Sequence, residues 1–271
     1  MLKLDLLKRA IKERLPDLDL VIGWRQGYDS LRTTPYYIRE EADLDHLTWS
    51  PLCVNNLASL LMHLRGRKVG LCVKGCDSRS VVQLLQEGII NRESVVIFGL
   101  PCRGVVDLKK IRKSIDIDHG TEVCLDKDTL HVAGHGDATS IPLSEVLADK
   151  CIRCQYPNPL EYDELIGNPL RPRVEDAPDD LFPELMLMSL EERFAFWTKQ
   201  MDRCIRCYAC RHACPLCFCR DYCIADSRDP KWMSQEPDVR EKWMFQMIHA
   251  VHLAGRCTEC GECERACPMD I

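Results

Sequence analysis

The cysteine pattern in the last third of the chain constrains the fold more than any other feature of the sequence. The spacing C-x-x-C-x-x-C-x-x-x-C-P occurs there twice. Three closely spaced thiolates hold three irons of one 4Fe-4S cubane, and in two-cluster ferredoxins the fourth cysteine ligates the other cluster. We therefore predict two clusters with crossed ligands. Cys204, Cys207, Cys210 and Cys267 would hold the first, and Cys257, Cys260, Cys263 and Cys214 the second.

Zinc is the main alternative for such a pattern, but a structural zinc site normally needs only two C-x-x-C pairs. Two complete copies, each followed by proline, favour iron-sulfur clusters. Proline keeps the residue before it out of the helical conformation and so helps to turn the chain away from the cluster. We predict a two-cluster ferredoxin-like helical domain at residues 188–271. Its first helix would begin at Ser189-Leu190-Glu191-Glu192, which has the spacing of a capping box. A second helix, from Asp238 to Ala254, carries an apolar stripe that we expect in the core.

Composition places these cysteines in a folded cytoplasmic protein. The 271 residues are 46% hydrophobic and carry a net charge of −6, with lysine and arginine scattered along the chain, which argues against nucleic acid or anionic lipid as partners. No apolar run approaches the about 18 residues that a membrane span needs. The charged N-terminus lacks a secretory signal. In the reducing cytoplasm, eighteen cysteines indicate metal binding rather than disulfides.

The first half of the chain alternates strand and helix patterns. Such an order is typical of a parallel sheet covered by helices, and we predict an α/β domain with a parallel-type sheet at residues 1–154. A hairpin at 122–133 would add edge strands, and the proline-rich segment 155–187 would be a linker. The expected strands are 18–24, 68–74 and 94–100, and the expected helices are 54–64, 80–86 and 105–115.

Four cysteines of this domain form a second candidate site. Cys76 and Cys102 each follow a predicted strand, and Cys151 and Cys154 form a C-x-x-C pair. The carboxyl ends of parallel strands meet at one edge of a sheet, where such sheets bind ligands. We therefore expect these four thiols to hold a third 4Fe-4S cluster. The alternative is a scatter of buried cysteines beside one C-x-x-C pair.

Asp77 and Ser78, directly after Cys76, are expected to cap the following helix. The N-terminal end of a helix is positively polarised and offers free N–H groups, which suits an anionic cluster or a phosphate. Asp77, Ser78 and Arg79 are therefore the candidate cofactor-binding residues, and FAD is the possible cofactor.

Three further cysteines exceed the needs of two clusters. They are Cys217, Cys219 and Cys223, directly after the first motif. Cys53, from the other domain, is a plausible fourth ligand that would complete a fourth cluster and dock the two domains. A zinc site or free thiols are the alternatives. Cys72 and Cys124 lie inside strand patterns and are expected to be core residues. The remaining sixteen cysteines match four cubanes.

The cysteine motifs together resemble those of a known family. The segments KGCDSRS, FGLPCRG, CIRCQYPNP, CIRCYACRHACPLCFC and AGRCTECGECERACP are similar to the beta-subunit family of deazaflavin-reducing hydrogenases and formate dehydrogenases. The match is best to bacterial members encoded beside heterodisulfide-reductase-like or formate dehydrogenase proteins. The resemblance implies an iron-sulfur subunit of anaerobic metabolism that passes electrons between catalytic partners, sometimes with a flavin of its own. Two features depart from the family. The ferredoxin module here follows the α/β domain, and the chain stops four residues after Cys267, where relatives continue.

Three hypotheses for function follow from these patterns. The first is an electron-transfer subunit of a cytoplasmic oxidoreductase complex, without catalytic residues of its own, which relays single electrons between partner subunits. The second is a flavin-containing subunit that splits the hydride of a deazaflavin or nicotinamide carrier into single electrons for the clusters. The third is a redox-sensing or scaffold protein whose clusters hold its domains together.

Overall fold

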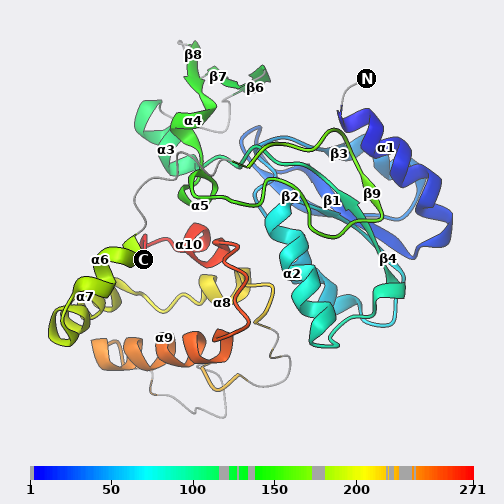
Figure 1. Ribbon diagram of the computed structural model, residues 1–271. Helices are drawn as coiled ribbons and strands as arrows, with labels where there is room; N and C mark the ends of the chain where they lie inside the picture. The colour runs from blue at the N-terminus through cyan, green and yellow to red at the C-terminus, as the bar shows by residue number, and fades with distance from the viewer. Residues whose placement is uncertain are drawn as a thin grey trace. The chain divides into compact units, whose positions relative to one another are not determined.

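The structure is a computed structural model that describes residues 3–115, 122–126, 128–133, 138–172, 181–217, 219, 223–225, 234 and 236–271. It comprises two compact units, residues 1–177 and residues 178–271 (Figure 1). The division between them falls inside the segment predicted as a linker.

The larger sheet of the first unit is mainly parallel. Its strand order is β2-β1-β4-β5-β9, and β3 also pairs with β1. The neighbours β1, β4, β5 and β9 run parallel, whereas β2 and β3 are antiparallel to β1. The strands are β1 (Leu20–Gln26), β2 (Thr33–Ile38), β3 (Leu47–Thr48), β4 (Val69–Val73), β5 (Val95–Gly99) and β9 (Glu164–Leu165).

Helices cover both faces of this sheet. All five residues of β4 are buried, as expected for a central parallel strand with two covered faces. Figure 1 shows α1 (Lys3–Arg14) on one side of the sheet and α2 (Gly75–Gln86) on the other. The predicted α/β fold is therefore confirmed. Short 3-10 helices connect the elements: η1 (Leu15–Asp17), η2 (Glu41–His46), η3 (Leu57–Leu64) and η4 (Arg92–Ser94).

All three predicted helices differ in their bounds from the structure, and α2, expected at 80–86, begins at Gly75. The segment predicted as a helix from residue 54 is the 3-10 helix η3, which begins only after Asn56, whose side chain accepts a hydrogen bond from Ala58 N. The third predicted helix begins later than expected, as α3 (Leu108–Ser114), because Asp107 caps it. Val106 before it is extended and forms a β-bridge with Leu147.

Strand β2 was not expected from the sequence. Its third residue is Pro35, which cannot donate to a strand ladder and so lowers the strand signal. The position of β2 at one end of the sheet order explains why the proline is tolerated, since an edge strand has one unpaired side.

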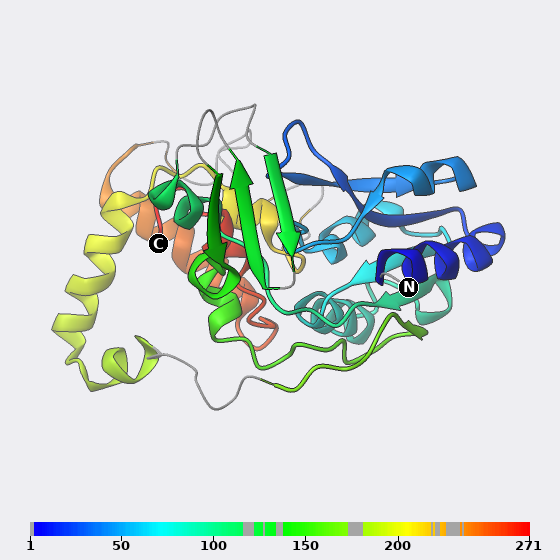
Figure 2. The same cartoon turned by 90° about the horizontal axis from the view of Figure 1, so that it is seen from above.

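The predicted hairpin forms a separate antiparallel sheet instead of edge strands on the larger one. Three strands pair in the order β6-β7-β8, side by side in green in Figure 2. The third strand, missed in the sequence, pairs with β7 along its whole length. This sheet shares a core with α3 and two short helices. The elements are β6 (Glu122–Asp126), β7 (Thr129–Ala133), β8 (Ala138–Pro142), α4 (Leu143–Val146) and α5 (Asp149–Ile152).

The proline-rich segment begins as part of the first unit. Strand β9 pairs with β5 through Phe98↔Glu164 and Gly99↔Leu165. The carbonyl of Pro157 accepts a hydrogen bond from Cys102 N at 2.7 Å. This stretch therefore packs against the sheet where β5 ends.

The second unit is helical, as predicted. Ser189 and Glu192 form the expected capping box at the start of α7. The rings of Phe194 on α7 and Trp243 on α9 stack with centroids 5.5 Å apart. The helices are α6 (Leu181–Leu187), α7 (Leu190–Arg203), α8 (Ala209–Ala213), α9 (Val239–Leu253) and α10 (Glu262–Ala266).

The apolar stripe predicted for α9 is only partly in the core: Trp243 stacks on Phe194 and Ile248 packs against the small cluster around Phe245. Met244, Met247 and Val251 are 47%, 54% and 65% exposed, and the buried residue of this helix is Phe245. Apolar residues occur all round this helix, so periodicity alone could not identify the buried face. Among the described residues, no helix is long and apolar enough to cross a membrane.

Phe98 lies on β5, which pairs with β4 on one side and β9 on the other, and it is fully buried. Replacing it with alanine should lower the free energy of unfolding by about 3–5 kcal/mol, because a large cavity is left in a packed core. Val96 on the same strand is only half-buried and provides the control, for which we expect a smaller loss. Urea unfolding of the full-length protein under anaerobic conditions measures both, and an equal loss would contradict this view of the core.

Candidate functional site

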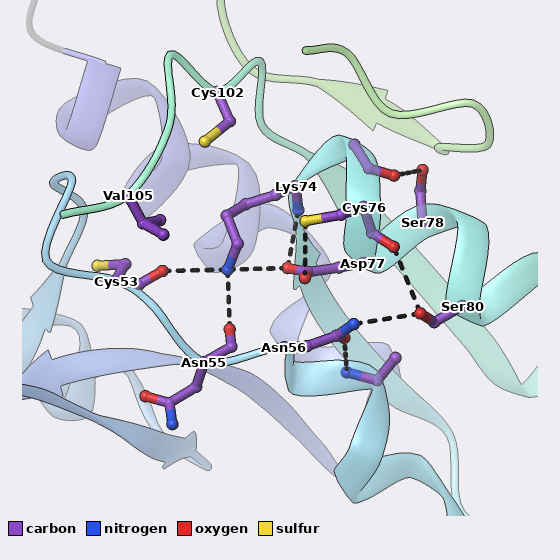
Figure 3. A network of polar contacts seen from close by, with 12 residues as sticks. Cys53, Asn55, Asn56, Lys74, Cys76, Asp77, Ser78, Ser80, Cys102 and Val105 are labelled. Carbon is purple, nitrogen blue, oxygen red and sulfur yellow. Dashed lines mark hydrogen bonds and ion pairs between the residues drawn. The ribbon is translucent and has the colours of Figure 1, made fainter. Parts of the chain in front are cut away.

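Four cysteines of the first unit line one cavity at the carboxyl ends of neighbouring strands. β4 leads into Cys76 and β5 leads into Cys102, while Cys151 lies on α5 and Cys154 shortly after it. Figure 3 shows Cys76 and Cys102 on either side of Lys74. The structure therefore brings together the four thiols predicted from the strand ends. The cavity is lined by Lys74, Gly75, Cys76, Cys102, Arg103, Gly104, Val105, Lys150, Cys151, Cys154, Tyr156 and Pro157.

Backbone N–H groups point at two of these sulfurs. Gly104 N donates to Cys102 Sγ at 3.3 Å, and Val105 N donates to Cys151 Sγ at 3.3 Å. Gly104 has a φ of +112°, and a Cβ there would meet Leu147 at 2.7 Å, so the turn requires glycine. Hydrogen bonds to cluster sulfurs stabilise the thiolate and help to set reduction potentials.

A second glycine closes the cavity from the other side. A Cβ on Gly75 would lie 1.8 Å from the carbonyl oxygen of Tyr156. The start of α2 therefore approaches the backbone that follows Cys154 as closely as only glycine allows. This contact joins the segment that carries Cys76 to the segment that carries Cys154.

Burial controls the chemistry of these thiols. It raises the pKa of Cys102 to about 12, raises the pKa of Cys76 well above its usual value, and also raises that of Cys151. The thiols are therefore protonated at neutral pH unless a metal displaces their protons, as coordination does. Four thiols around one cavity, with N–H donors aimed at two of them, fit a 4Fe-4S cluster.

The structure gives the candidate flavin residues internal partners. Asp77 and Ser78 are fully buried. Asp77 accepts a hydrogen bond from Lys74 N at 3.0 Å, and Ser78 bonds Gly75 O and Leu160 N. The guanidinium of Arg79 lies over the ring of Tyr156, 3.9 Å from its centroid. These contacts hold the start of α2 in place and do not favour a flavin at Asp77 or Ser78.

Cys53 is fully buried within the first unit. Its Sγ accepts a hydrogen bond from Ser50 N at 3.4 Å and donates to Thr48 O at 3.8 Å. Cys72, on β4, is also fully buried, as expected for a core residue. The side chain of Cys124 lies outside the described residues.

The two cysteine motifs of the second unit adopt the same backbone conformation. Arg206 and Glu259 have φ values of 51° and 53°, and Tyr208 and Gly261 have values of 60° and 64°. These pairs hold equivalent positions, two and four residues after the first cysteine of each motif. Side chains at such φ values cost energy, so the matching conformation is a constraint imposed by the motif.

The turns direct N–H groups at the first sulfur of each motif. Arg206 N donates to Cys204 Sγ, and Glu259 N donates to Cys257 Sγ, each at 3.4 Å. From α9, Gln246 Nε2 donates to Cys204 Sγ at 3.7 Å.

The structure places the last cysteine of each motif beside the other motif. Cys267 lines the same cavity, of about 260 Å³, as the first three cysteines of the first motif and Cys263. Burial, together with the neighbouring thiols of Cys260, Cys217 and Cys263, raises the pKa of Cys214 to about 12. Helices α8 and α10, which precede Cys214 and Cys267, contact each other. This is the arrangement that crossed ligation requires.

The three surplus cysteines lie together in the second unit. Burial raises the pKa of Cys217, and the thiols of Cys219 and Cys223 raise it further. Burial also raises the pKa of Cys219, which interacts with Cys223 and with the cations of Arg211 and Arg256. The structure thus groups these three thiols, while Cys53 belongs to the other unit.

Among the described residues, no three His, Cys, Asp or Glu side chains are grouped to hold a single metal ion. A cubane carries its four thiolates on four different irons, whereas a structural zinc ion gathers them on one centre. Ligands of a cubane therefore lie further apart, around a cavity.

Comparison with known proteins bears on both units. A model of the 4Fe-4S dicluster domain matches residues 200–271. The F420-dependent formate dehydrogenase subunit beta of Methanocaldococcus jannaschii is 26% identical, and the match covers 98% of this chain and 84% of that protein. The F420-dependent formate dehydrogenase 1 subunit beta of Methanococcus maripaludis is also 26% identical, over 88% of this chain and 76% of that protein.

Among solved structures, a chain of the F420-reducing [NiFe] hydrogenase complex of Methanosarcina barkeri is 16% identical, with a TM-score of 0.43, over 56% of this chain and 58% of that chain. The resemblance to formate dehydrogenase beta subunits is confirmed by the two sequence relatives over most of the chain. The C-terminal region binds two 4Fe-4S clusters, because the doubled cysteine motif and the match to the dicluster domain both indicate them.

The close approach at Gly75 can be tested by substitution. Gly75→Ala should destabilise the first unit by more than the about 1–2 kcal/mol that a left-handed residue costs, because the new Cβ would overlap a backbone oxygen. Gly88, just after the same helix, has a φ of +64° and open space around it, so Gly88→Ala is the control that carries backbone strain alone. Thermal unfolding of both variants makes the comparison, and equal effects would show that the overlap is relieved without cost.

Proposed function

We propose that this chain is the iron-sulfur, electron-transferring beta subunit of an oxidoreductase complex of the F420-dependent formate dehydrogenase type. The observation that carries the proposal is the doubled cysteine motif in a region that matches the dicluster domain. Two clusters in one small domain suit the transfer of single electrons, because each cubane takes up and releases one electron without rearranging its ligands. Similarity to two beta subunits over most of the chain supports the place in the complex.

In this role the chain supplies ligands and surroundings, and partner subunits supply catalysis. Its own residues hold the cluster sulfurs, donate backbone N–H groups to them and exclude water. The eighteen cysteines are best kept reduced in the cytoplasm, and none of the cysteines whose side chains are described forms a disulfide.

The first unit extends the electron path in this proposal. Cys76, Cys102, Cys151 and Cys154 would hold a third 4Fe-4S cluster. The support is that all four line one cavity and that Gly104 N and Val105 N donate to two of the sulfurs.

A fourth cluster is the least supported part of the proposal. Cys217, Cys219 and Cys223 lie together, which is what three ligands of one cluster require. Cys53 would be the fourth ligand, but its thiol is buried with hydrogen-bond partners inside the first unit. A fourth cluster with Cys53 would thus require the thiol to leave these partners.

Iron content tests how far the path extends. Anaerobically purified protein should contain about twelve iron and twelve sulfide per chain if the third cluster is present, about sixteen with a fourth, and about eight with the ferredoxin pair alone. A value near eight would reduce the cysteines of the first unit to packing residues. A value near four would contradict the dicluster assignment itself.

Crossed ligation can be tested by the additivity of iron loss. Cys204 and Cys267 would share a cluster, so a Cys204→Ser, Cys267→Ser double variant should lose about four iron, no more than Cys204→Ser alone. Cys204→Ser combined with Cys214→Ser should lose about eight, because these two residues would hold different clusters. The reverse pattern would show that each motif binds one cluster by itself.

A further inference from the structure

A lysine ammonium is buried beneath the four-cysteine cavity of the first unit. Lys74 is only 1% exposed, although lysine is one of the residues least often buried. It lies at the junction of β4 and α2, close to Cys76 (Figure 3), and it lines the same cavity as the four cysteines. A buried charge is costly unless it is paired and hydrogen-bonded, so its place beside the thiols needs a reason.

The ammonium is held in one position. Lys74 Nζ donates to Cys53 O at 3.0 Å and to Asn55 O at 2.8 Å, and it pairs with Asp77 Oδ2 at 3.1 Å. It also lies 4.5 Å from the ring centroid of Trp24. An ammonium has three N–H donors, and these three oxygens match them. Lys74 therefore acts on the cavity through its charge.

The partner carboxylate is set further back. Asp77 is fully buried and is absent from the described lining of the cavity. It is nevertheless close to one thiol, since Cys76 Sγ lies 3.6 Å from Asp77 Oδ1. The pair thus presents its positive member to the cavity, with its negative member beside Cys76.

A second cation reaches the cavity from α5. Lys150 also lines it, next to Cys151 in the sequence, and it is half-buried. The side chains of two lysines from different elements therefore line the cavity with the four cysteines.

We propose that Lys74 and Lys150 raise the reduction potential of the cluster that these four cysteines would hold, so that it accepts electrons more readily than the same ligands would allow alone. Both are positioning residues, because they would act on the cluster through space without ligating it. This inference rests on the third cluster of the proposed function.

The charges around the thiols support this assignment. Lys74 interacts electrostatically with Cys76, Cys102 and Cys151, and Lys150 interacts with Cys76 and Cys151. The carboxylate of Asp77 acts on Cys76 and Cys102 with the opposite sign. Cations that favour negative charge on the sulfurs also favour the added charge of a reduced cluster.

The redox step itself is simple. One electron passes from an external donor to the cluster, which gains one negative charge, while each lysine keeps its proton and no bond forms or breaks. In a buried site of low dielectric, a fixed charge acts strongly on such a change. Removing a cation should therefore lower the potential, and removing the carboxylate should raise it.

Redox titration with dithionite, followed by electron paramagnetic resonance on the full chain, provides the test. For Lys74→Met we expect the ratio of reduced to oxidised third cluster at a given potential to fall at least tenfold. For a one-electron couple, this corresponds to a midpoint potential lower by about 59 mV. Lys150→Gln should shift it in the same direction by less, because Lys150 is half-exposed. Asp77→Asn should shift it in the opposite direction.

The control lies at the other end of the same strand. Lys68 is exposed and precedes β4, about 20 Å from Lys74 along the strand, and Lys68→Gln should leave the potential unchanged. If the wild type holds only about eight iron, the third cluster itself fails, and this inference fails with it. If the third cluster is present but Lys150→Gln and Asp77→Asn leave its potential unchanged, the inference alone is overturned. These two variants decide the question even if Lys74→Met does not fold.

Discussion

The structure depends on how charge on buried sulfur is compensated. A thiolate taken out of water loses its solvation, and burial raises the thiol pKa of Cys102 and Cys214 to about 12. A chain that gathers many cysteines in its interior must therefore offer them metal, hydrogen-bond donors or cations. In the described parts of both units, the backbone around the sulfurs is shaped to provide donors.

The two units meet this constraint by different routes. In the second unit the solution is local, because each motif folds its own turn and aims an N–H group two residues on at its first sulfur. In the first unit it is assembled from distant segments. Val105 N reaches the sulfur of Cys151, and Gly75 allows α2 to approach Tyr156. The N–H donors of the second unit are therefore part of the repeated cysteine motif, whereas those of the first unit depend on the folded sheet.

The differences between expectation and structure have specific causes. Strand β2 was hidden by Pro35, which an edge strand tolerates. The buried face of α9 could not be read from its sequence, since apolar residues surround the helix and Phe245 is the one that packs inward. Asp77 and Ser78 suggested a ligand site at the start of α2, but their polar groups are used to secure that helix. A pattern of residues shows what chemistry is available, while packing decides which groups remain free to perform it.

The sequence by itself determined the dicluster region and the alternation of strands β1, β4 and β5 with helical segments in the first unit. Both are encoded by local signals, namely cysteine spacing and apolar runs whose period does not depend on distant residues. It also suggested that Cys76 and Cys102 meet, because parallel strands end at one edge. The C-x-x-C pair of Cys151 and Cys154 was expected to join them, but only the tertiary structure showed how α5 brings the pair there and placed Lys74 in the same cavity. These contacts join residues separated by dozens of positions, and they depend on close packing, which leaves no periodic trace in the chain.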